Sequence, residues 1–447
     1  MDFDVIVIGG GPAGEHCAGR LVEAGLKVAI AERELLGGEC SYWACIPSKT
    51  LLRPGEAIAQ AREAPAAREA VSGDLDAEQA FGWRDFMVSD YDDSGQESWA
   101  EGEGIAVLRG GGRITGPGKV TVAGEEHSAR DIVIATGSAP VFPPIDGLQG
   151  LDGVWTNREV TGLKEVPRRL LVLGGGPVGV EMAQAVRRMG SEVVLIERDR
   201  LLGRQPEALG EALADVLSTD GVELHFGQHA SSARREDGEY VLTLEDGTEL
   251  RGDRLLVATG RRPRVDDLGL ETVGIEAGKR GIEVDSRLRA GDGVWAIGDA
   301  TGDWPLTYVG KYQGRVVAEN IQGGEREVNY EAVPLVVFTD PQAASVGQAD
   351  GELSATVQLS AVARTSTYTR AYADKPGFMT LVSDGERLTG AHALGPEAGE
   401  WLQQATVAIR AGVPLGVMND VIQPFPSFSE AFLDAMLELR SKVPATA

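Results

Sequence analysis

Short apolar runs alternate with helix-like segments at the start of the chain, and the same arrangement returns later. Residues 4–14 read DVIVIGGGPAG and residues 169–179 read RLLVLGGGPVG, in each case an apolar run, a glycine turn and a helix-like segment. A second apolar run then ends in an acidic residue, at Glu32 in the first copy and at Glu197 in the second. The glycines and the acidic residues of the two copies are both 165 residues apart. The repeat predicts two βαβ units of matching size.

A second repeated element is an apolar strand that runs into Ala-Thr-Gly, at 132–138 (IVIATGS) and again at 255–261 (LLVATGR). Between these two strands, residues 217–250 are expected to form an antiparallel meander with turns at Asp237-Gly238 and Asp246-Gly247. Asp-Gly pairs favour tight hairpin turns because both residues tolerate positive φ angles. This part of the chain therefore combines the signals of parallel strands and of hairpins.

Two further regions differ from the repeats. Residues 60–104 are rich in Ala, Glu and Asp and are expected to be mainly helical, with an exposed acidic loop near Tyr91. From about residue 327 the chain has separated strands followed by helices near 397–411 and 428–441. We therefore expect an α/β fold with two Rossmann-type three-layer domains and a C-terminal α+β domain.

Composition limits the classes of partner. The 447 residues carry a net charge of −26, and 43% of them are hydrophobic and 25% charged. These proportions are typical of a globular protein, and the acidity disfavours nucleic acid and anionic membrane surfaces as partners. No apolar run is long enough for insertion into a membrane, and no basic-then-apolar leader precedes the first strand. With only three cysteines, a cytoplasmic enzyme acting on a small-molecule substrate is expected.

The first glycine turn has the residues needed to bind a dinucleotide. Gly9, Gly11 and Gly14 follow an apolar strand and open a helix, and Glu32 ends the next strand. Glycines at these positions let the backbone approach a pyrophosphate, which then lies at the helix N-terminus. The carboxylate at the end of the second strand binds ribose hydroxyls. Strand, turn, helix and acidic residue together indicate a nucleotide site rather than a plain turn.

The second turn repeats this arrangement with Gly174, Gly176, Gly179 and Glu197. Glu197 favours an unphosphorylated ribose and hence NADH. Arg198 and Arg200 are close enough in sequence to contact a 2′-phosphate, so NADPH stays an alternative. Two dinucleotide sites in one chain suggest a flavin and a nicotinamide that work as a pair in hydride transfer.

Cys40 and Cys45 lie in the segment GGECSYWACIPSK, residues 37–49, directly after the first βαβ unit. Residues five apart on an ideal helix hold their Cα atoms too far apart for a disulfide, so a disulfide here requires a distorted turn. Two buried thiols without a redox role are the alternative.

Together with both glycine turns and both Ala-Thr-Gly strands, this segment resembles the pyridine nucleotide–disulfide oxidoreductases, which include dihydrolipoamide dehydrogenase, glutathione reductase and mercuric reductase. The resemblance covers essentially the whole chain and extends to WAIGD at 295–299 and VVFTDPQAASVG at 336–347. It implies FAD on the first Rossmann unit and NAD(P)H on the second. The expected domains are an FAD-binding domain of residues 1–146 and 267–326, an NAD(P)-binding domain of 147–266 and a dimerisation domain of 327–447.

The resemblance also implies roles for individual residues. Cys45 corresponds to the thiol beside the flavin and Cys40 to the interchange thiol that attacks the substrate, and the two are expected to form a disulfide in the resting enzyme. Lys49 is expected near flavin N5, paired with Glu181. The other implied cofactor contacts are Thr136, Gly137 and Asp299 for FAD, and Gly260 and Arg261 at the end of the second Ala-Thr-Gly strand. The family forms a homodimer in which the C-terminal domain completes the active site of the other subunit.

One departure from the family concerns its acid–base residue. The family places a His-Pro pair a few residues before a Glu, and the His, oriented by that Glu, handles the proton of the interchange thiol. In IQPFPSFSEA at 422–431, Pro426 and Glu430 align with this motif, but the His position holds Phe425. Because phenylalanine cannot transfer a proton, we expect poor turnover of lipoamide or glutathione disulfide.

Other departures are smaller. The aromatic pair Tyr42 and Trp43 lies between the cysteines, where packing is favoured over a role in substrate access. The five histidines show no metal-ligand spacing, and the tail lacks the cysteine pair with which mercuric reductases deliver metal, so neither a metal site nor Hg(II) reduction is expected. Tyr308 and Tyr312 are candidate proton donors near the flavin.

Three functions fit these observations. The favoured one, because both cysteines are present, is an FAD-dependent NAD(P)H oxidoreductase that passes electrons through Cys40 and Cys45 to a disulfide, in a role in cell redox homeostasis. The second is a reductase of the same fold that acts on a quinone, dye, metal ion or oxygen, acceptors that need little proton chemistry at Cys40. The third is a non-catalytic flavoprotein whose cysteine pair senses redox state, which the intact motifs at every cofactor contact disfavour.

Overall fold

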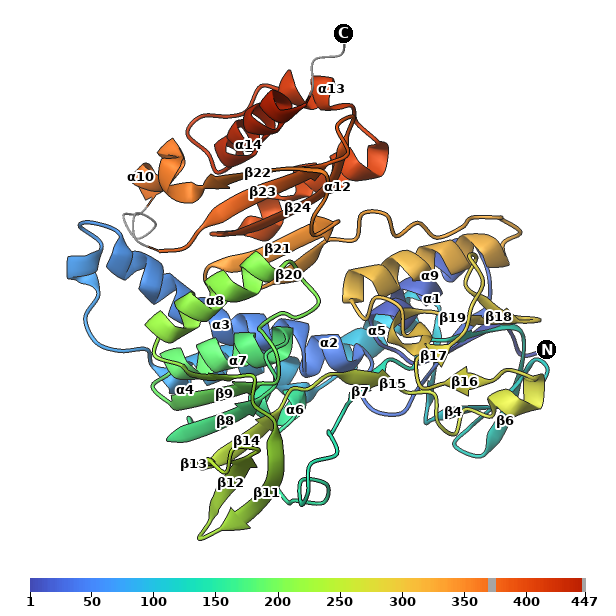
Figure 1. Ribbon diagram of the computed structural model, residues 1–447. Coiled ribbons are helices and arrows are strands. Elements are labelled where there is room, and N and C mark those ends of the chain that lie inside the picture. Colours follow the sequence, from blue (N-terminus) through green and yellow to red (C-terminus); the bar gives the residue numbers. More distant parts are fainter. Residues whose placement is uncertain (369–374, 444–447) are drawn as a thin grey trace. The chain divides into compact units, whose positions relative to one another are not determined.

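The computed structural model describes residues 1–368 and 375–443, which form two compact units (Figure 1). The first unit comprises Met1–Ser48, Gly82–Val141 and Gly260–Asn329. The second comprises Lys49–Phe81, Phe142–Thr259 and the described residues from Tyr330 onward. No helix of the described residues is both long and apolar enough to cross a membrane.

The first unit is built on a parallel sheet with the strand order β19-β6-β1-β2-β3. An antiparallel strand, β18, extends one edge beside β19, and the β4–β5 hairpin pairs with the beginning of β6. The strands are β1 (Phe3–Ile8), β2 (Val28–Glu32), β3 (Ala106–Arg109), β4 (Gly112–Gly116), β5 (Lys119–Val122), β6 (Glu125–Ile134), β18 (Arg289–Gly291) and β19 (Val294–Ala296). Two short ladders join β7 (Ser138–Pro140) to β15 (Arg261–Pro263) and β16 (Ala277–Gly278) to β17 (Gly281–Ile282).

Alternation along β1 creates the layers of this unit. Val5 and Val7 point to one face, where they join a core with α1 (Pro12–Glu23) and α9 (Thr307–Ile321), and these two helices pack side by side (Figure 1). Ile6 and Ile8 point to the other face and pack with residues of the β4–β5 hairpin. The other helices that begin in this unit are α2 (Gly38–Tyr42), α3 (Cys45–Glu63) and α5 (Ser94–Glu103). The result is the three-layer arrangement expected from the first repeat.

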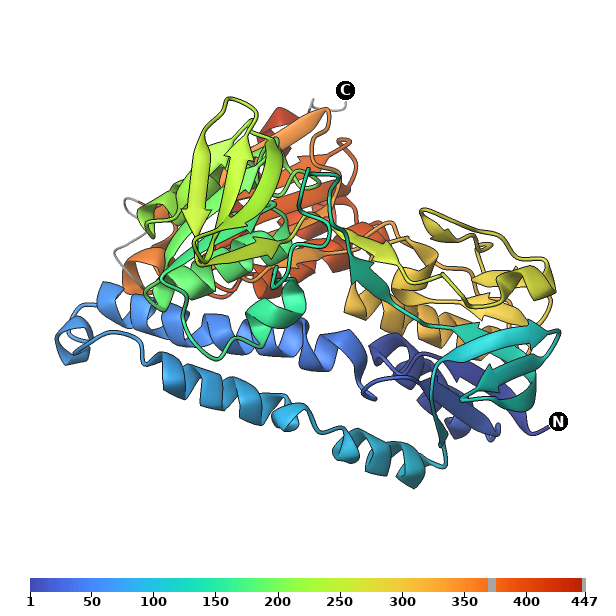
Figure 2. The same cartoon turned by 90° about the horizontal axis from the view of Figure 1, so that it is seen from below.

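The second unit contains the other repeat. Its parallel sheet has the order β10-β9-β8-β14, with one face covered by helices and the other by a three-stranded antiparallel sheet (Figure 2). The strands are β8 (Arg169–Leu173), β9 (Glu192–Glu197), β10 (Glu223–Phe226), β14 (Arg254–Val257), β11 (Ala230–Glu236), β12 (Glu239–Leu244) and β13 (Glu249–Gly252). The helices are α4 (Ala77–Met87), which ends in the first unit, α6 (Asn157–Thr161), α7 (Pro177–Arg188) and α8 (Glu207–Thr219).

The expected meander exists but begins later than predicted. Both Asp-Gly turns join its strands, which start at Ala230. Residues 217–219 instead end α8, and β10 pairs in parallel with β9. The prediction was wrong there because β10, a short strand at the sheet edge, has the same alternating pattern as a hairpin strand.

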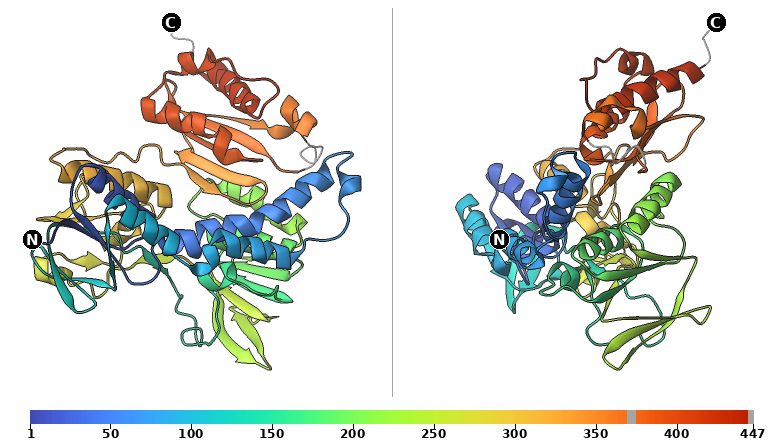
Figure 3. Two further views of the ribbon diagram at one scale, coloured as in Figure 1. Left: turned by 180° about the vertical axis from the view of Figure 1, so that it is seen from behind. Right: turned by 90° about the vertical axis from the view of Figure 1, so that its left-hand side faces the viewer.

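The C-terminal part of the second unit is an antiparallel sheet of order β20-β21-β24-β23-β22 with helices packed on it (Figure 3). α14 packs against β22 and β23, and α12 against β21 and β24. The strands are β20 (Leu335–Val337), β21 (Gln342–Gly347), β22 (Leu353–Gln358), β23 (Phe378–Ser383) and β24 (Leu388–Gly395). The helices are α10 (Ala363–Tyr368), α11 (Ala398–Trp401), α12 (Gln403–Ala411), α13 (Leu415–Asn419) and α14 (Ser429–Lys442). Among the described residues, the 3₁₀ turns are Arg68–Ala70, Ser89–Tyr91, Leu270–Val273, Gly298–Thr301 and Leu359–Ala361.

His392 makes the stability of this sheet depend on pH. It is 5% exposed in β24, its ring contacts Phe378 edge-on at 6.0 Å, and burial lowers its pKa to about 4. An unfolded histidine titrates near 6.5, so the unfolded state binds more protons below that pH. The stability that the neutral ring contributes is present above about pH 6.5 and is lost as pH falls toward 4.

We therefore predict that His392→Leu flattens the pH dependence of thermal unfolding between pH 7 and pH 4. The wild type should lose up to about 3 kcal/mol more than the variant over this range. Calorimetric unfolding of both proteins at several pH values measures the difference. Parallel curves for the two proteins would show that His392 does not contribute.

Candidate active site

The first glycine turn is a backbone-to-backbone contact that leaves no room for side chains. Gly9 has φ +108°, and a Cβ there would lie 2.4 Å from the carbonyl oxygen of Ala135. A Cβ at Gly14 would lie 2.0 Å from the carbonyl oxygen of Gly9. At Gly11, however, the nearest heavy atom to a Cβ is Gly38 Cα at 4.0 Å, so this position borders open space. That space at the N-terminus of α1 fits the approach of a pyrophosphate.

Glu32 holds the turn from the end of β2. Its Oε2 accepts a hydrogen bond from the backbone N–H of Gly10 at 2.7 Å, and its Oε1 accepts one from Glu34 at 2.7 Å. A carboxylate fixed in this way faces the ribose position of a dinucleotide lying on the turn. The structure therefore brings the predicted glycines and Glu32 together.

Glu15 is a residue of this site that the sequence analysis missed. It follows Gly14 in α1, and its Oε1 is buried without a hydrogen-bond partner. Burial and the nearby Glu32 carboxylate raise the pKa of Glu15 to about 7, against the opposing charge of Lys311. In the sequence, Glu15 is distinguished only by its position directly after the third glycine, and no general rule assigns a function to that position.

The other predicted flavin contacts lie in the same unit. Asp299 Oδ2 accepts a hydrogen bond from the Ser138 hydroxyl, and Thr136 Oγ1 donates to the carbonyl oxygen of Arg264 at 2.6 Å. Arg261 lies with them, because its Nε and Nη2 donate to Ser138 Oγ and O at 2.7 and 2.8 Å. The structure thus places Arg261 beside the Asp299–Ser138 pair in the first unit, together with its neighbour Gly260.

The second glycine turn has the same geometry in the second unit. Gly174 has φ +112°, and a Cβ there would lie 2.5 Å from the carbonyl oxygen of Ala258. A Cβ at Gly179 would lie 1.9 Å from Gly174 O, whereas a Cβ at Gly176 would meet nothing within 4 Å. The two turns therefore match in both their tight and their open positions.

Glu197 holds the second turn as Glu32 holds the first. Its Oε2 accepts a hydrogen bond from the backbone N–H of Gly175 at 2.6 Å. Arg200 donates to the carbonyl oxygens of Gly203 and Gln205 at 3.2 and 2.9 Å, which ties it to its own loop. Arg198 is exposed. Of the two arginines, Arg198 is therefore the one better placed to meet a 2′-phosphate.

The turn between the cysteines is distorted, as its spacing predicts for a disulfide-forming pair. Cys40 lies in α2, the helix stops at Trp43 with φ −135°, and Cys45 begins α3. The structure has no disulfide between Cys40 and Cys45. Thr307 Oγ1 donates to Cys40 Sγ at 3.2 Å and lies 3.4 Å from Cys45 Sγ. One hydroxyl therefore contacts both sulfurs.

The surroundings of Cys40 favour its protonated form. The hydrogen bond from Cys45 and burial raise the pKa of the Cys40 thiol, and the hydrogen bond from Thr307 opposes this shift. Burial and the charge of Cys45 raise the pKa of Tyr308 to about 12. Tyr308 therefore carries its proton at neutral pH and can act as a donor.

Lys49 and Glu181 form the expected pair in the second unit. Lys49 Nζ lies 2.7 Å from Glu181 Oε2, and Glu181, in α7, is buried. Glu181 Oε1 accepts a hydrogen bond from the backbone N–H of Phe338 at 2.9 Å, and Lys49 lies over the Phe338 ring at 4.7 Å. The lysine head group is thus held by one charged and one aromatic contact.

Tyr42 and Trp43 pack as expected. Tyr42 is 1% exposed, and its hydroxyl donates to Leu36 O at 3.1 Å. Trp43 stacks on Tyr91, with ring centroids 6.4 Å apart. The aromatic residues between the cysteines therefore fix the turn against the rest of the unit.

The segment at the family's acid–base position is exposed. Phe425 is 76% exposed, and the Phe425–Pro426 peptide bond is cis. Glu430, at the start of α14, accepts a hydrogen bond from the backbone N–H of Ser427 at 3.0 Å. The carboxylate that orients a histidine in the family here caps the turn before the helix.

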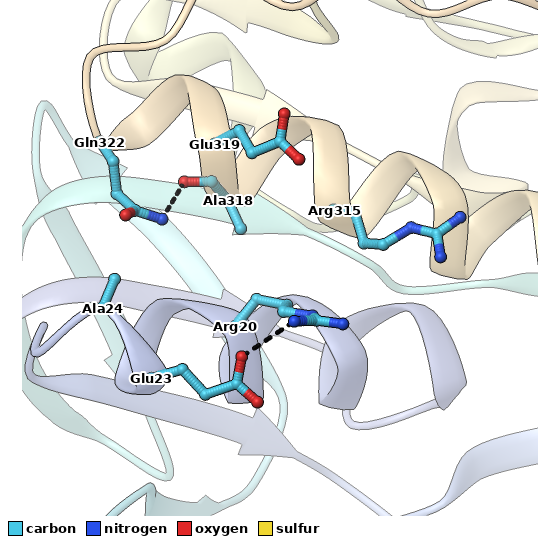
Figure 4. Close-up of a pocket in the computed structure, with 7 residues that line it drawn as sticks. All are labelled: Arg20, Glu23, Ala24, Arg315, Ala318, Glu319 and Gln322. Carbon is cyan, nitrogen blue, oxygen red and sulfur yellow. Dashed lines mark hydrogen bonds and ion pairs between the residues drawn. The ribbon is translucent and has the colours of Figure 1, made fainter.

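A pocket of about 420 Å³ lies between α1 and α9 (Figure 4). Its lining carries charges of both signs, including an Arg20–Glu23 ion pair at 3.1 Å. The lining residues are Arg20, Glu23, Ala24, Arg315, Ala318, Glu319 and Gln322. None of them belongs to the predicted site, and no cluster of metal-ligating side chains is found among the described residues.

The open positions at Gly11 and Gly176 give a matched test of the two cofactor sites. Gly11→Ala should leave the fold intact but weaken FAD binding by roughly tenfold or more, about 1.4 kcal/mol, because the methyl group occupies the cofactor's space. Gly176→Ala should retain FAD and raise the KM for NAD(P)H. Flavin absorbance, melting curves and steady-state kinetics distinguish the two. Gly14→Ala is the contrast and should fail to fold. If Gly11→Ala binds FAD normally, this turn is not the flavin site.

Comparison with known proteins agrees with this geometry. Residues 3–314 match the family described as pyridine nucleotide-disulphide oxidoreductase, and residues 333–436 match its dimerisation domain. The chain is 34% identical to a dihydrolipoyl dehydrogenase of Thermus scotoductus, over 97% of this chain and 96% of the relative. It is also 34% identical to a mercuric reductase of Acidithiobacillus ferrooxidans, over 96% of this chain and 81% of the relative.

A solved structure has the same fold over nearly the whole length. The HOCl-induced flavoprotein disulfide reductase RclA from Escherichia coli superposes with a TM-score of 0.84, at 27% identity, over 99% of this chain and 100% of that chain. The matched regions contain both glycine turns, both cysteines and the C-terminal sheet. The chain therefore belongs to the pyridine nucleotide-disulphide oxidoreductase family.

Proposed function

We propose that this protein is an FAD-dependent NAD(P)H oxidoreductase that reduces a disulfide substrate through Cys40 and Cys45. One observation carries the proposal: both thiols lie within hydrogen-bond reach of a single hydroxyl, in the unit that holds the Gly9–Gly14 turn. A pair of sulfurs held this close can exchange between dithiol and disulfide without a rearrangement of the fold.

The family binds FAD and uses NAD(P)H as electron donor. When bound, FAD would supply the transfer of two electrons, received as a hydride from NAD(P)H. In the proposed reaction, NAD(P)H, a proton and the substrate disulfide give NAD(P)⁺ and two thiols. Cys45 receives the electrons next to the flavin, and Cys40 attacks the substrate. The ion pair with the buried Glu181 fixes the Lys49 head group for the role near flavin N5 that the family implies.

We expect NADH to be the preferred donor. In NADPH, the 2′-phosphate would lie against the negatively charged carboxylate of Glu197. Arg200 is already hydrogen-bonded within its own loop. The kcat/KM for NADH should exceed that for NADPH by about tenfold, or about 1.4 kcal/mol. Arg198→Ala should lower the NADPH value further and leave the NADH value within about twofold. Equal or reversed ratios in the wild type would contradict this assignment.

A second candidate function is reduction of a quinone, a dye or a metal ion. Phe425 favours it, because an exposed phenylalanine stands where the family has its acid–base histidine. Electron transfer to such acceptors needs no proton delivery at Cys40. The relatives leave both candidates open, since they include dihydrolipoyl dehydrogenases and mercuric reductases. The third candidate function is redox sensing without turnover. Steady-state NADH oxidation with a physiological acceptor would exclude it.

We further propose that the protein is a homodimer that acts in cytoplasmic redox homeostasis. The dimerisation-domain match supports the assembly. Large apolar side chains are exposed on the C-terminal domain, at Val407, Val417, Val421, Ile422, Phe425 and Leu437. Side chains of this kind are costly to leave in water and are typical of subunit interfaces.

The proposed function is tested by the steady-state rates at which NADH reduces a panel of electron acceptors, measured for the wild type and for variants of Phe425. The wild type should reduce lipoamide and glutathione disulfide slowly. Phe425→His should raise these disulfide rates by about tenfold or more, because it restores the family's acid–base residue at the family's sequence spacing from Glu430. Phe425→Leu is the control and should not raise them, and the quinone rate should change less than twofold in either variant.

Two outcomes would contradict this account. Rapid turnover of lipoamide or glutathione disulfide by the wild type, not raised in Phe425→His, would show that position 425 does not limit the reaction. Turnover of quinones alone, unchanged when Cys40 is replaced by Ser, would establish the second candidate function in place of the first.

A further inference from the structure

Thr307 occupies the position between the two thiols. It is the first residue of α9, and it contacts Cys40 Sγ at 3.2 Å as a donor and Cys45 Sγ at 3.4 Å. A hydroxyl has one proton to donate and lone pairs with which to accept. Thr307 can therefore donate to one sulfur while it accepts from the other. Both hydrogen bonds reverse when the hydroxyl rotates and one proton moves from one sulfur to the other.

Two titratable groups that neighbour the pair in sequence, Tyr308 and Glu39, are poor bases for Cys40. Tyr308, next to Thr307 in α9, keeps its proton because burial and the charge of Cys45 raise its pKa to about 12. Glu39, next to Cys40 in α2, is engaged by Arg264 at 3.0 Å and by Arg261 at 3.5 Å. A carboxylate held by two guanidinium groups is a poor proton acceptor.

We propose that the Thr307 hydroxyl relays a proton between Cys40 and Cys45, so that the Cys45 thiolate serves as the base for Cys40 where Phe425 offers none. This inference rests on the proposed disulfide reduction. It assigns to a single side chain the proton transfer for which the family uses a histidine. The relay stays within the first unit and needs no residue of another subunit.

The steps balance in protons and electrons. In the two-electron-reduced pair, Cys45 is a thiolate and Cys40 a thiol. Thr307 gives its hydroxyl proton to Cys45 and takes the proton of Cys40, which becomes the thiolate. Cys40 then attacks the substrate disulfide, forms a mixed disulfide and releases the first substrate thiolate, which takes the proton from Cys45. Finally, the Cys45 thiolate attacks Cys40 Sγ, the Cys40–Cys45 disulfide forms, and the second substrate thiolate leaves and takes a proton from water.

The test measures the thiols directly. FAD-loaded protein is reduced with a phosphine, and the rate of Cys40 alkylation by iodoacetamide is followed against pH by mass spectrometry. Thr307→Val, which keeps the shape without the hydroxyl, should raise the midpoint of this profile by about one pH unit. Thr307→Ser should restore the midpoint to that of the wild type. Thr121→Val, a partly buried threonine in β5 of the same unit, is the control and should not change it.

Turnover gives a second readout. Thr307→Val should slow disulfide reduction by about tenfold, while the rate at which NADH reduces the flavin stays unchanged in all variants. Identical alkylation profiles for Thr307→Val and the wild type would overturn the relay. An equal shift in Thr307→Val and Thr307→Ser would also overturn it, because packing rather than the hydroxyl would then be responsible. If the wild type reduces no disulfide but the profiles shift as expected, the proposed substrate class is wrong while the hydrogen bond to the thiols stands.

Discussion

Contact between backbone atoms at the two glycine turns is the constraint on which the rest of this structure depends. At Gly9 and at Gly174, the chain passes so close to the carbonyl oxygen of Ala135 or Ala258 that a side chain cannot fit. The following helix in each case starts against the turn itself, at Gly14 and at Gly179. This close backbone contact fixes the direction of the helix N-termini and the position of the acidic residues at the strand ends. Both proposed cofactor sites follow from it, because the open positions at Gly11 and Gly176 border the N-termini of α1 and α7.

The same constraint explains how much could be predicted from the sequence. The glycine turns and the Ala-Thr-Gly strands were recognised as two separate repeats, and the structure shows that each strand supplies the carbonyl group that its glycine turn contacts. Where no such close contact exists, the sequence was less informative. β10 and the hairpin strand β11 have similar patterns, so their partners could not be told apart. Thr307 could not be found at all, because its role arises from a helix start placed 262 residues after Cys45.

The cysteine turn combines rigid support with a reactive pair. Tyr42 is fixed by its hydrogen bond to Leu36, and Trp43 by stacking on Tyr91, so the break between α2 and α3 is held in place. The two sulfurs project from this break toward the Thr307 hydroxyl. In the proposed relay, the proton transfer that the family assigns to a histidine passes to Cys45 and to Thr307 of α9.

The central claim is that Cys40, Cys45 and FAD act as one redox unit, and an anaerobic reductive titration tests it most directly. FAD takes up two electrons and a disulfide takes up two more, so the wild type should consume four electrons per chain and show long-wavelength absorption after the first two. Cys45→Ser should consume two and show no such absorption. Uptake of only two electrons by the wild type, with a spectrum identical to that of Cys45→Ser, would contradict the account.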